Sequence, residues 1–138
     1  MTRSVYLVFG LLLLGFSQIS AISDVSRKAT IQALHNSCVK ETGVDEQMIT
    51  DCSSGIFAED ERLKCYMKCL LVYGSVMDEN TGELNLKALE AFIPEDCREE
   101  AIPIIHECGV VKGSNNCDTA FQTNKCWQSK APEKYKLF

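Results

Sequence analysis

The sequence predicts an all-α protein, a compact disulfide-bonded bundle of six helices that encloses an apolar cavity. Apolar residues recur at three- and four-residue spacing along most of the chain, which is the period of a helix buried on one face. No run of alternating polar and apolar residues is long enough to predict a strand. Eight cysteines in 138 residues indicate a cross-linked fold. The bulky apolar side chains exceed what four bridges need, so a cavity is expected as well as a core.

The first 21 residues are predicted to be a secretory signal peptide. Arg3 gives this segment a positive charge, and the apolar stretch that follows is too short to span a bilayer. We place cleavage after Ala21, with Ser23 as the second choice; a retained signal anchor is the alternative. No later stretch is long and apolar enough to cross a membrane. The mature chain, residues 22–138, is therefore expected to be one secreted, extracellular domain.

Six helices are expected in the mature chain, and glycine or proline separates several of them. They span Ser23–Thr42, Asp45–Ser54, Asp60–Gly74, Asn85–Ile93, Glu95–Val111 and Cys117–Gln128. Gly43 ends the first helix, and Gly55 ends the short second one. On the first helix, Ile31, Leu34 and Cys38 share one face, so this face is expected to turn inward.

The third helix, Asp60–Gly74, is the apolar helix around which the others are expected to pack. Met67 and Leu70 lie on the same face of it. Cys65 and Cys69 are four residues apart, so their sulfur atoms leave the helix side by side. A helix with so little polar surface is expected in the interior, and its two adjacent cysteines suggest that two other segments are tied to it.

The later part of the chain is interrupted by proline and ends in a tail. Leu89 is one of the inward residues of the fourth helix, and Pro94 breaks that helix. Pro103 lies inside the predicted fifth helix, so this helix either kinks there or starts later, with Pro103 near its first turn. Phe121 marks the inward face of the sixth helix. Residues Ser129–Phe138 form the tail.

The mature chain is acidic. Removing the signal takes away one of the 14 basic side chains and none of the 19 acidic ones, which leaves a net charge of about −6. The charges are interspersed, which argues against nucleic acid or an anionic membrane surface as a partner. On the third helix, Lys64 and Lys68 form the only clearly polar strip.

No metal ion or other cofactor is expected. Cys65 and Cys69 could supply two ligands of a zinc site. His106 and Cys108 could supply the rest, but disulfides are expected before metal in a secreted chain with eight cysteines. The segment Asp78–Gly82 resembles part of a calcium loop, but its glycine comes one position early. We interpret this segment as a turn between helices.

The histidines do not indicate an enzyme. His35 and His106 are the only two, and neither belongs to a set of nucleophile, base and orienting group. A calcium-dependent secreted phospholipase would place a His-Asp pair beside cysteines, whereas Cys65 and Cys69 enclose Tyr-Met-Lys. We interpret both histidines as ordinary surface or helix-end residues.

The cysteine spacing is the most specific pattern in the chain. With Cys52 and Cys97 set aside, the remaining six follow the pattern Cys38-x26-Cys65-x3-Cys69-x38-Cys108-x8-Cys117-x8-Cys126. This pattern closely resembles the six-cysteine signature of the insect odorant-binding proteins, the family of pheromone-binding and general odorant-binding proteins. The resemblance covers the whole mature chain and includes the signal peptide, the acidic balance and the six helices.

The resemblance implies three disulfide bridges in a helical bundle around an apolar cavity. The implied pairs are Cys38–Cys69, Cys65–Cys117 and Cys108–Cys126. Cys52 and Cys97 have no place in the six-cysteine pattern. By elimination we expect them to bridge each other, with two free thiols or an intermolecular bridge as the alternatives.

The resemblance also implies carriage rather than catalysis. The expected function is a secreted carrier that binds odorants or pheromones in its cavity, with a chemosensory receptor as a second candidate partner. Leu71 and Val76 lie where family members line the cavity, and Trp127 matches another lining position. The candidate ligand-binding residues are Met67, Leu70, Leu71, Val76, Leu89, Ile105, Phe121, Trp127, Tyr135, Leu137 and Phe138.

Alternatives remain for the tail, the role and the assembly. The tail, residues 129–138, is predicted to form a lid or wall of the cavity, and a frayed terminus is the alternative. The same scaffold could serve as a non-olfactory carrier or scavenger of lipids or hormones, and a small secreted enzyme is a third class. The expected assembly is a monomer or a weak homodimer.

Overall fold

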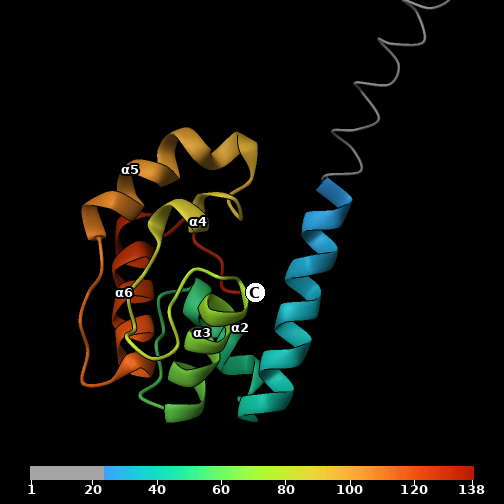
Figure 1. Ribbon diagram of the computed structural model, residues 1–138, viewed down its shortest axis with the longest axis vertical. Helices are drawn as coiled ribbons and strands as arrows, with labels where there is room; N and C mark the ends of the chain where they lie inside the picture. Colours follow the sequence, from blue (N-terminus) through green and yellow to red (C-terminus); the bar gives the residue numbers. More distant parts are fainter. Residues whose placement is uncertain (1–23) are drawn as a thin grey trace, which may run out of the picture. The chain divides into compact units, whose positions relative to one another are not determined.

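The computed structural model describes residues 24–138 and divides the chain into two units, residues 1–32 and 33–138 (Figure 1). The predicted signal peptide and its cleavage site lie outside the described residues. In the first unit, residues 24–32 are helical, and Arg27 forms an ion pair with Asp24 one turn away. Helical residues 33–42 open the second unit, which also holds all the remaining helices.

The second unit is all-α, as the sequence predicts. Its labelled elements are α2 (Glu46–Ser53), α3 (Glu61–Tyr73), α4 (Leu86–Glu90), the 3₁₀ helix η1 (Glu95–Cys97), α5 (Arg98–Cys108) and α6 (Asn116–Lys130). Over residues 24–138 the extended pairing is limited to one isolated antiparallel bridge between Met77 and Leu84.

Short polar side chains fix where the helices begin. The Asp60 carboxylate accepts hydrogen bonds from the backbone N–H groups of Arg62 and Leu63, at 2.8 and 3.3 Å. Asn85 caps α4 and Asn115 caps α6 in the same way. These side chains satisfy donors that the first turn of a helix leaves unpaired, so each marks a helix start.

Helix boundaries differ from the predictions at two places. The third helix, Glu61–Tyr73, ends close to its predicted end, before the turn at Ser75, where φ is +59°. The fourth helix ends at Glu90, so most of its predicted second half is a turn. The predicted fifth helix splits into η1 and α5. Helix α5 begins well before Pro103, which is exposed inside it, so a later start at that proline is wrong.

The segment that resembled a calcium loop is a turn, as predicted. The Asp78 carboxylate accepts hydrogen bonds from the backbone N–H groups of Asn80 and Thr81, at 2.9 and 2.8 Å. Gly82 follows with a φ of +70°, a left-handed conformation that glycine adopts without strain. This arrangement uses the aspartate oxygen to close the turn between α3 and α4.

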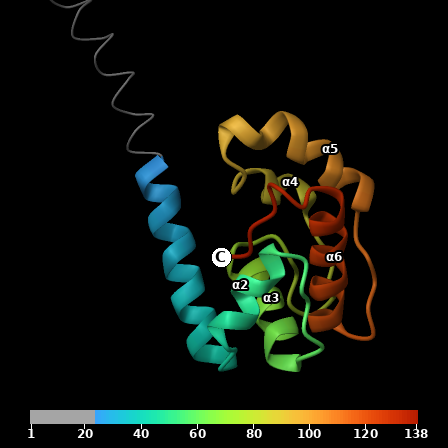
Figure 2. The same cartoon turned by 180° about the vertical axis from the view of Figure 1, so that it is seen from behind.

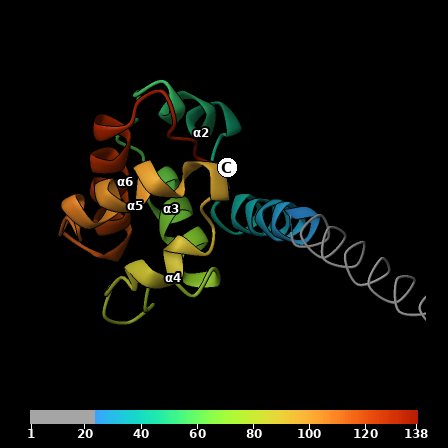
Figure 3. The same cartoon turned by 90° about the horizontal axis from the view of Figure 1, so that it is seen from above.

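Helix α3 lies at the centre of the second unit, with α2, α4, α5 and α6 around it (Figure 3). Helices α3 and α6 pack along each other, and α6 also packs against α5. Tyr66 and Phe121 are the largest fully buried side chains, one from each helix of the main pair. The hydrophobic core is therefore built mainly between α3 and α6.

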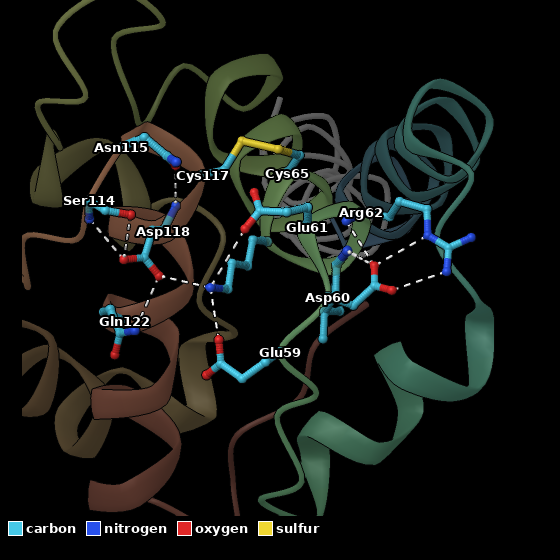
Figure 4. A network of polar contacts seen from close by, with 12 residues as sticks. Glu59, Asp60, Glu61, Arg62, Cys65, Ser114, Asn115, Cys117, Asp118 and Gln122 are labelled. Atoms are coloured by element: carbon cyan, nitrogen blue, oxygen red, sulfur yellow. Dashed lines mark hydrogen bonds and ion pairs between the residues drawn. A yellow bond between two sulfur atoms is a disulfide. The ribbon is translucent and has the colours of Figure 1, made fainter.

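A partly buried cation, Lys64, joins the start of α3 to the start of α6, and Figure 4 shows the carboxylates of Glu59 and Asp118 that it pairs with. The Lys64 ammonium lies 2.8 Å from a Glu59 oxygen and 3.3 Å from an Asp118 oxygen, and its side chain is only 12% exposed. Lys64, predicted to lie in the polar strip of the third helix, therefore faces carboxylates rather than open solvent. Hydrogen bonds from the Ser114 backbone N–H, the Gln122 amide and Lys64 lower the pKa of Asp118 to about 2.

Three disulfides cross-link the second unit, with the pairing that the family resemblance implies. Cys65–Cys117 joins α3 to α6, Cys108–Cys126 joins α5 to α6, and Cys38–Cys69 joins helical residues 33–42 to α3. The central helix therefore carries two bridges, and α6 also carries two.

The predicted fourth bridge is absent, because Cys52 and Cys97 are both free thiols. Cys52 is fully buried on α2, where its Sγ contacts the Met48 backbone oxygen at 3.2 Å. Cys97 is half-buried in η1, and Figures 1 and 2 place the chain leading into α5 above α2. The expected bridge between Cys52 and Cys97 rested on the number of cysteines alone and took no account of where the two residues lie in the fold. Burial, with a smaller effect of Asp51, raises the pKa of Cys52 to about 11.

Candidate functional site

The predicted ligand-binding residues gather in the interior of the second unit, with one exception. Six of them are buried members of the core: Met67, Leu71, Val76, Ile105, Phe121 and Trp127. Four are partly buried and pack against that core: Leu70, Leu89, Tyr135 and Leu137. Phe138 is 46% exposed and lies outside the buried core.

Different elements bring these side chains together. Leu71 lies on the buried face of α3, and Val76 follows from the turn behind it. Ile105 comes from α5, while Phe121 and Trp127 come from α6, six residues and nearly two turns apart. The result is a continuous apolar interior with contributions from three helices and a turn.

The tail turns back onto this interior. The hydroxyl of Tyr135 donates a hydrogen bond to Oδ1 of Asn124, at 2.8 Å. The Tyr135 ring lies 6.2 Å from the Phe57 ring, and that ring meets Phe121 edge-on at 5.7 Å, measured between centroids. Burial raises the pKa of Tyr135 well above its usual value, so its hydroxyl keeps the proton. The tail is thus packed against the core rather than frayed.

Tyr66 holds the end of the tail. Its side chain is fully buried, and its hydroxyl donates to the backbone oxygen of Phe138. The His35 Nδ1 lies 2.8 Å from the same hydroxyl, and the His35 Nε2 lies 3.3 Å from a Glu46 oxygen. Burial, and to a lesser degree Glu46, raises the pKa of Tyr66. His35 is 16% exposed, so its interpretation as an ordinary surface residue is wrong.

Nearly every buried polar side chain has a partner. Thr119 and Thr123 of α6 accept hydrogen bonds from backbone N–H groups of residues 111–113. The Asn124 amide is bonded through both its oxygen and its nitrogen. In the described part of the chain, the one buried side-chain nitrogen or oxygen without a hydrogen-bond partner is the indole Nε1 of Trp127.

Sequence reasoning missed the polar residues of this interior. Asn124 stands three residues after Phe121 and three before Trp127, so helix periodicity alone places its amide on the buried face. A polar residue at an inward position was the available signal. Tyr66 was assigned to the apolar face, but nothing local in the sequence shows that its hydroxyl meets Phe138, 72 residues away.

A surface hollow lies outside the apolar interior. It is a surface cleft of about 400 Å³ over α3, and its lining is Glu41, Thr42, Glu61, Arg62, Cys65, Lys68, Cys69, Val72, Tyr73, Glu79 and Cys117. Three carboxylates and two cations line it. Such a lining suits a polar molecule, whereas pockets for hydrophobic ligands are mostly apolar.

Neither a metal centre nor a membrane span is built by residues 24–138. No group of three or more histidine, cysteine, aspartate or glutamate side chains is placed there to hold a metal ion. None of the described helices is both long and apolar enough to cross a membrane. His106 pairs with Glu90, with Nε2 and Oε1 3.0 Å apart, and is half exposed, as expected of a surface histidine.

A model of the PBP/GOBP family matches residues 21–130. Among curated proteins, general odorant-binding protein 69a of Drosophila melanogaster is 28% identical over 99 residues, which cover 70% of this chain. The match spans 66% of that relative's length, just under two thirds.

Two solved structures are similar over most of the chain. Odorant-binding protein 4 of Chrysopa pallens is 25% identical with a TM-score of 0.72, and the match covers 83% of this chain and 97% of that one. Odorant-binding protein 7 of Anopheles gambiae, described as having four disulfide bridges and solved with an azo compound, is 32% identical with a TM-score of 0.63. That match covers 74% of this chain and 83% of the mosquito protein.

Proposed function

The chain belongs to the PBP/GOBP family, and we propose that it is a secreted carrier that binds an odorant or pheromone in the interior of residues 33–138. The family and the fold are those of odorant-binding carriers rather than enzymes, and they support carriage of a small hydrophobic ligand. The observation that carries the proposal is the apolar interior, to which α3, α5, α6, the turn after α3 and the tail all contribute.

The energetics of such an interior suit a small ligand. A molecule that removes about 300 Å² of apolar surface from water gains about 7.5 kcal/mol. That value is close to the free energy of micromolar binding, about 8 kcal/mol. Three disulfides allow the fold to open an internal space around a ligand without depending on core packing alone.

We propose that the tail forms one wall of the binding site. Leu137 and Tyr135 pack against the core, and the tail is held there by two tyrosine hydroxyls, those of Tyr66 and Tyr135. Both tyrosines can be replaced by phenylalanine with little change in volume. Such variants remove the hydrogen bonds that hold the tail while nearly keeping the volume of each side chain.

The experiment for carriage is displacement of an environment-sensitive fluorescent probe from the oxidised mature protein. The competitors are volatile alcohols, ketones, esters and fatty acids, with polar compounds of similar size as controls. Saturable binding near micromolar, with displacement by apolar compounds alone, supports a carrier. A correctly bridged protein that binds no probe would overturn the proposal. A preference for long fatty acids over volatiles would instead favour a non-olfactory lipid carrier.

The experiment for the tail is the ligand off-rate of the Tyr66→Phe and Tyr135→Phe variants. Each removes one hydrogen bond that holds residues 131–138. We expect a faster off-rate in each, by about 2- to 10-fold for a net bond of about 1 kcal/mol. Tyr73→Phe is the matched control, since it removes a hydroxyl bonded to Glu41 on the exposed surface. Equal ligand off-rates in all three variants would contradict the proposal that the tail forms a wall of the binding site.

A chemosensory receptor is a predicted second partner, and a monomer or weak homodimer is the predicted assembly. The receptor prediction requires that the rate at which the ligand leaves this protein change when the receptor is present. Sedimentation of the mature protein with and without ligand measures the assembly directly. A tight dimer would contradict the predicted state.

A further inference from the structure

The indole N–H of Trp127 is buried and has no protein acceptor, alone among the buried side-chain donors and acceptors of residues 24–138. The side chain is 9% exposed, and it belongs to the core cluster rather than to the surface. Burying a hydrogen-bond donor without an acceptor is unfavourable, and nearly all buried donors in native structures have a partner.

The polar side chains near Trp127 on α6 do not accept a hydrogen bond from its indole N–H. Thr123 and Asn124 lie one turn before Trp127 on α6, and both are buried. The Thr123 hydroxyl is engaged with the backbone of Val111, and the Asn124 oxygen accepts from Tyr135. The oxygens nearest along the helix are therefore committed to holding a loop and the tail.

Cations lie at the edge of the interior and not within it. None of the fully buried residues of the described chain carries a charged side chain. Two ammonium groups approach the Phe121 ring: that of Lys64, which already faces the carboxylates of Glu59 and Asp118, and that of Lys125, 5.4 Å from the ring centroid. An anionic ligand in the interior would have no fully buried cation to offset its desolvation, which is costly for an unpaired charge.

We propose that the Trp127 indole donates a hydrogen bond to an oxygen of the ligand, and that the preferred ligands are uncharged apolar molecules with a hydrogen-bond acceptor. Ketones, aldehydes, esters and ethers belong to this class. Pure hydrocarbons lack the acceptor, and carboxylates carry a charge that the interior does not match. This inference rests on the proposed carrier function and names the chemistry of its ligand.

The chain holds a single tryptophan, so nitrogen-15 labelling gives one indole N–H resonance that needs no assignment. We expect 2-nonanone at saturation to shift this resonance downfield. Its isostere 2-methyl-1-nonene, in which a methylene group replaces the oxygen, should leave it without that downfield shift. A resonance that responds equally to the two compounds, or to neither while both bind, would overturn the proposal.

The Trp127→Phe variant gives a second, independent measurement. In the native protein the ketone should bind more tightly than its isostere, and the ratio of the two dissociation constants should fall by about 2- to 12-fold in the variant, the range for one neutral hydrogen bond. Tyr73→Phe, in the charged surface cleft, is the control that should keep the ratio. An unchanged ratio in Trp127→Phe would contradict the proposal, whatever the absolute affinities.

A last comparison tests the charge. Methyl nonanoate should bind more tightly than nonanoate at neutral pH, because both carry an acceptor but only the acid is ionised. Tighter binding of the acid would overturn the assignment of an uncharged ligand. Binding of none of these compounds would instead count against the carrier function itself, so the two failures are distinguishable.

Discussion

Two regions of residues 33–138 are built differently. The frame, defined as α3 and α6, has 11 buried residues among 28, and one disulfide and the Lys64–Asp118 ion pair join its two helices. The flap, defined as α4, η1 and α5, has one buried residue, Ile105, among 19. The flap should therefore separate from the core at a lower free energy than the frame.

The difference teaches how a carrier can be both stable and able to open. The flap is fastened to the rest by the Cys108–Cys126 bridge and by exposed ion pairs, Lys130 with Glu107 and Lys134 with Glu100. Exposed pairs contribute little, typically under about 1 kcal/mol. In Figure 2 the flap lies above α3. We expect a ligand to be admitted by movement of the flap while the frame keeps its packing.

The largest contrast should appear when one apolar side chain is removed from each region. Phe121→Ala in the frame should lower the free energy of unfolding by about 3–5 kcal/mol, because the ring is fully buried. Leu89→Ala in the flap should cost only about 1–2 kcal/mol, since that side chain is half-buried. Urea unfolding of the two variants measures both values. Equal losses would show that the flap is as firmly packed as the frame.

Removing one disulfide from each region should give a smaller contrast. Cys65 and Cys117 are 52 residues apart, whereas Cys108 and Cys126 are 18 apart. The entropy of the unfolded chain predicts losses of about 4 and about 3 kcal/mol when each pair is changed to serine. Guanidinium unfolding of the double variants gives the difference. A larger loss from the Cys108–Cys126 pair would mean that the flap contributes more than its burial indicates.

Acid should weaken the frame through Asp118. The pKa of this carboxyl is lowered from 3.8 to about 2 in the folded protein, so its contribution is present above pH 4 and is lost as the pH falls through about 2. Asp118→Asn should flatten the dependence of stability on pH between about 4 and 2. Asp96→Asn, on the exposed surface of the flap, is the control. Identical pH profiles for the native protein and Asp118→Asn would contradict the frame network.

The two free thiols should differ in reactivity by region. Cys97 in the flap is half-buried and should react with a thiol reagent in the folded protein. Cys52, fully buried with its pKa raised to about 11, should react only after unfolding. Unfolded but unreduced protein should show two thiols, and the Cys97→Ser variant should show one. No reactive thiol after unfolding would mean that the two cysteines are bridged after all.

Local patterns in the sequence predicted most of the fold. Helix period and the glycines and prolines between helices located most of the helices, because these signals act over a few residues. The free, buried thiol of Cys52 and the ion pairing of Lys64 could not be predicted from local patterns. Each depends on where distant segments lie, since Cys52 is buried in the core that α2 shares with other helices and Asp118 on α6 pairs with the Lys64 ammonium.

The candidate site was predicted on its apolar side and missed on its polar side. Burial of Phe121 follows from helix phase, the inward place of Trp127 was implied by the family resemblance, and both are in the core. The hydrogen bonds of Tyr66 and Tyr135 join residues far apart in the sequence or in different elements, so no local pattern reveals them. The unpaired indole of Trp127 is visible only when all its neighbours are in place.

Hydrogen exchange with and without saturating 2-nonanone tests the central claim most directly. If the ligand lies in the apolar interior beneath the flap, amides of α4 and α5 should exchange more slowly in its presence, while those of α6 should change little. Protection confined to residues around the charged surface cleft, such as 41–42 and 79, would place the ligand outside the interior and contradict the account.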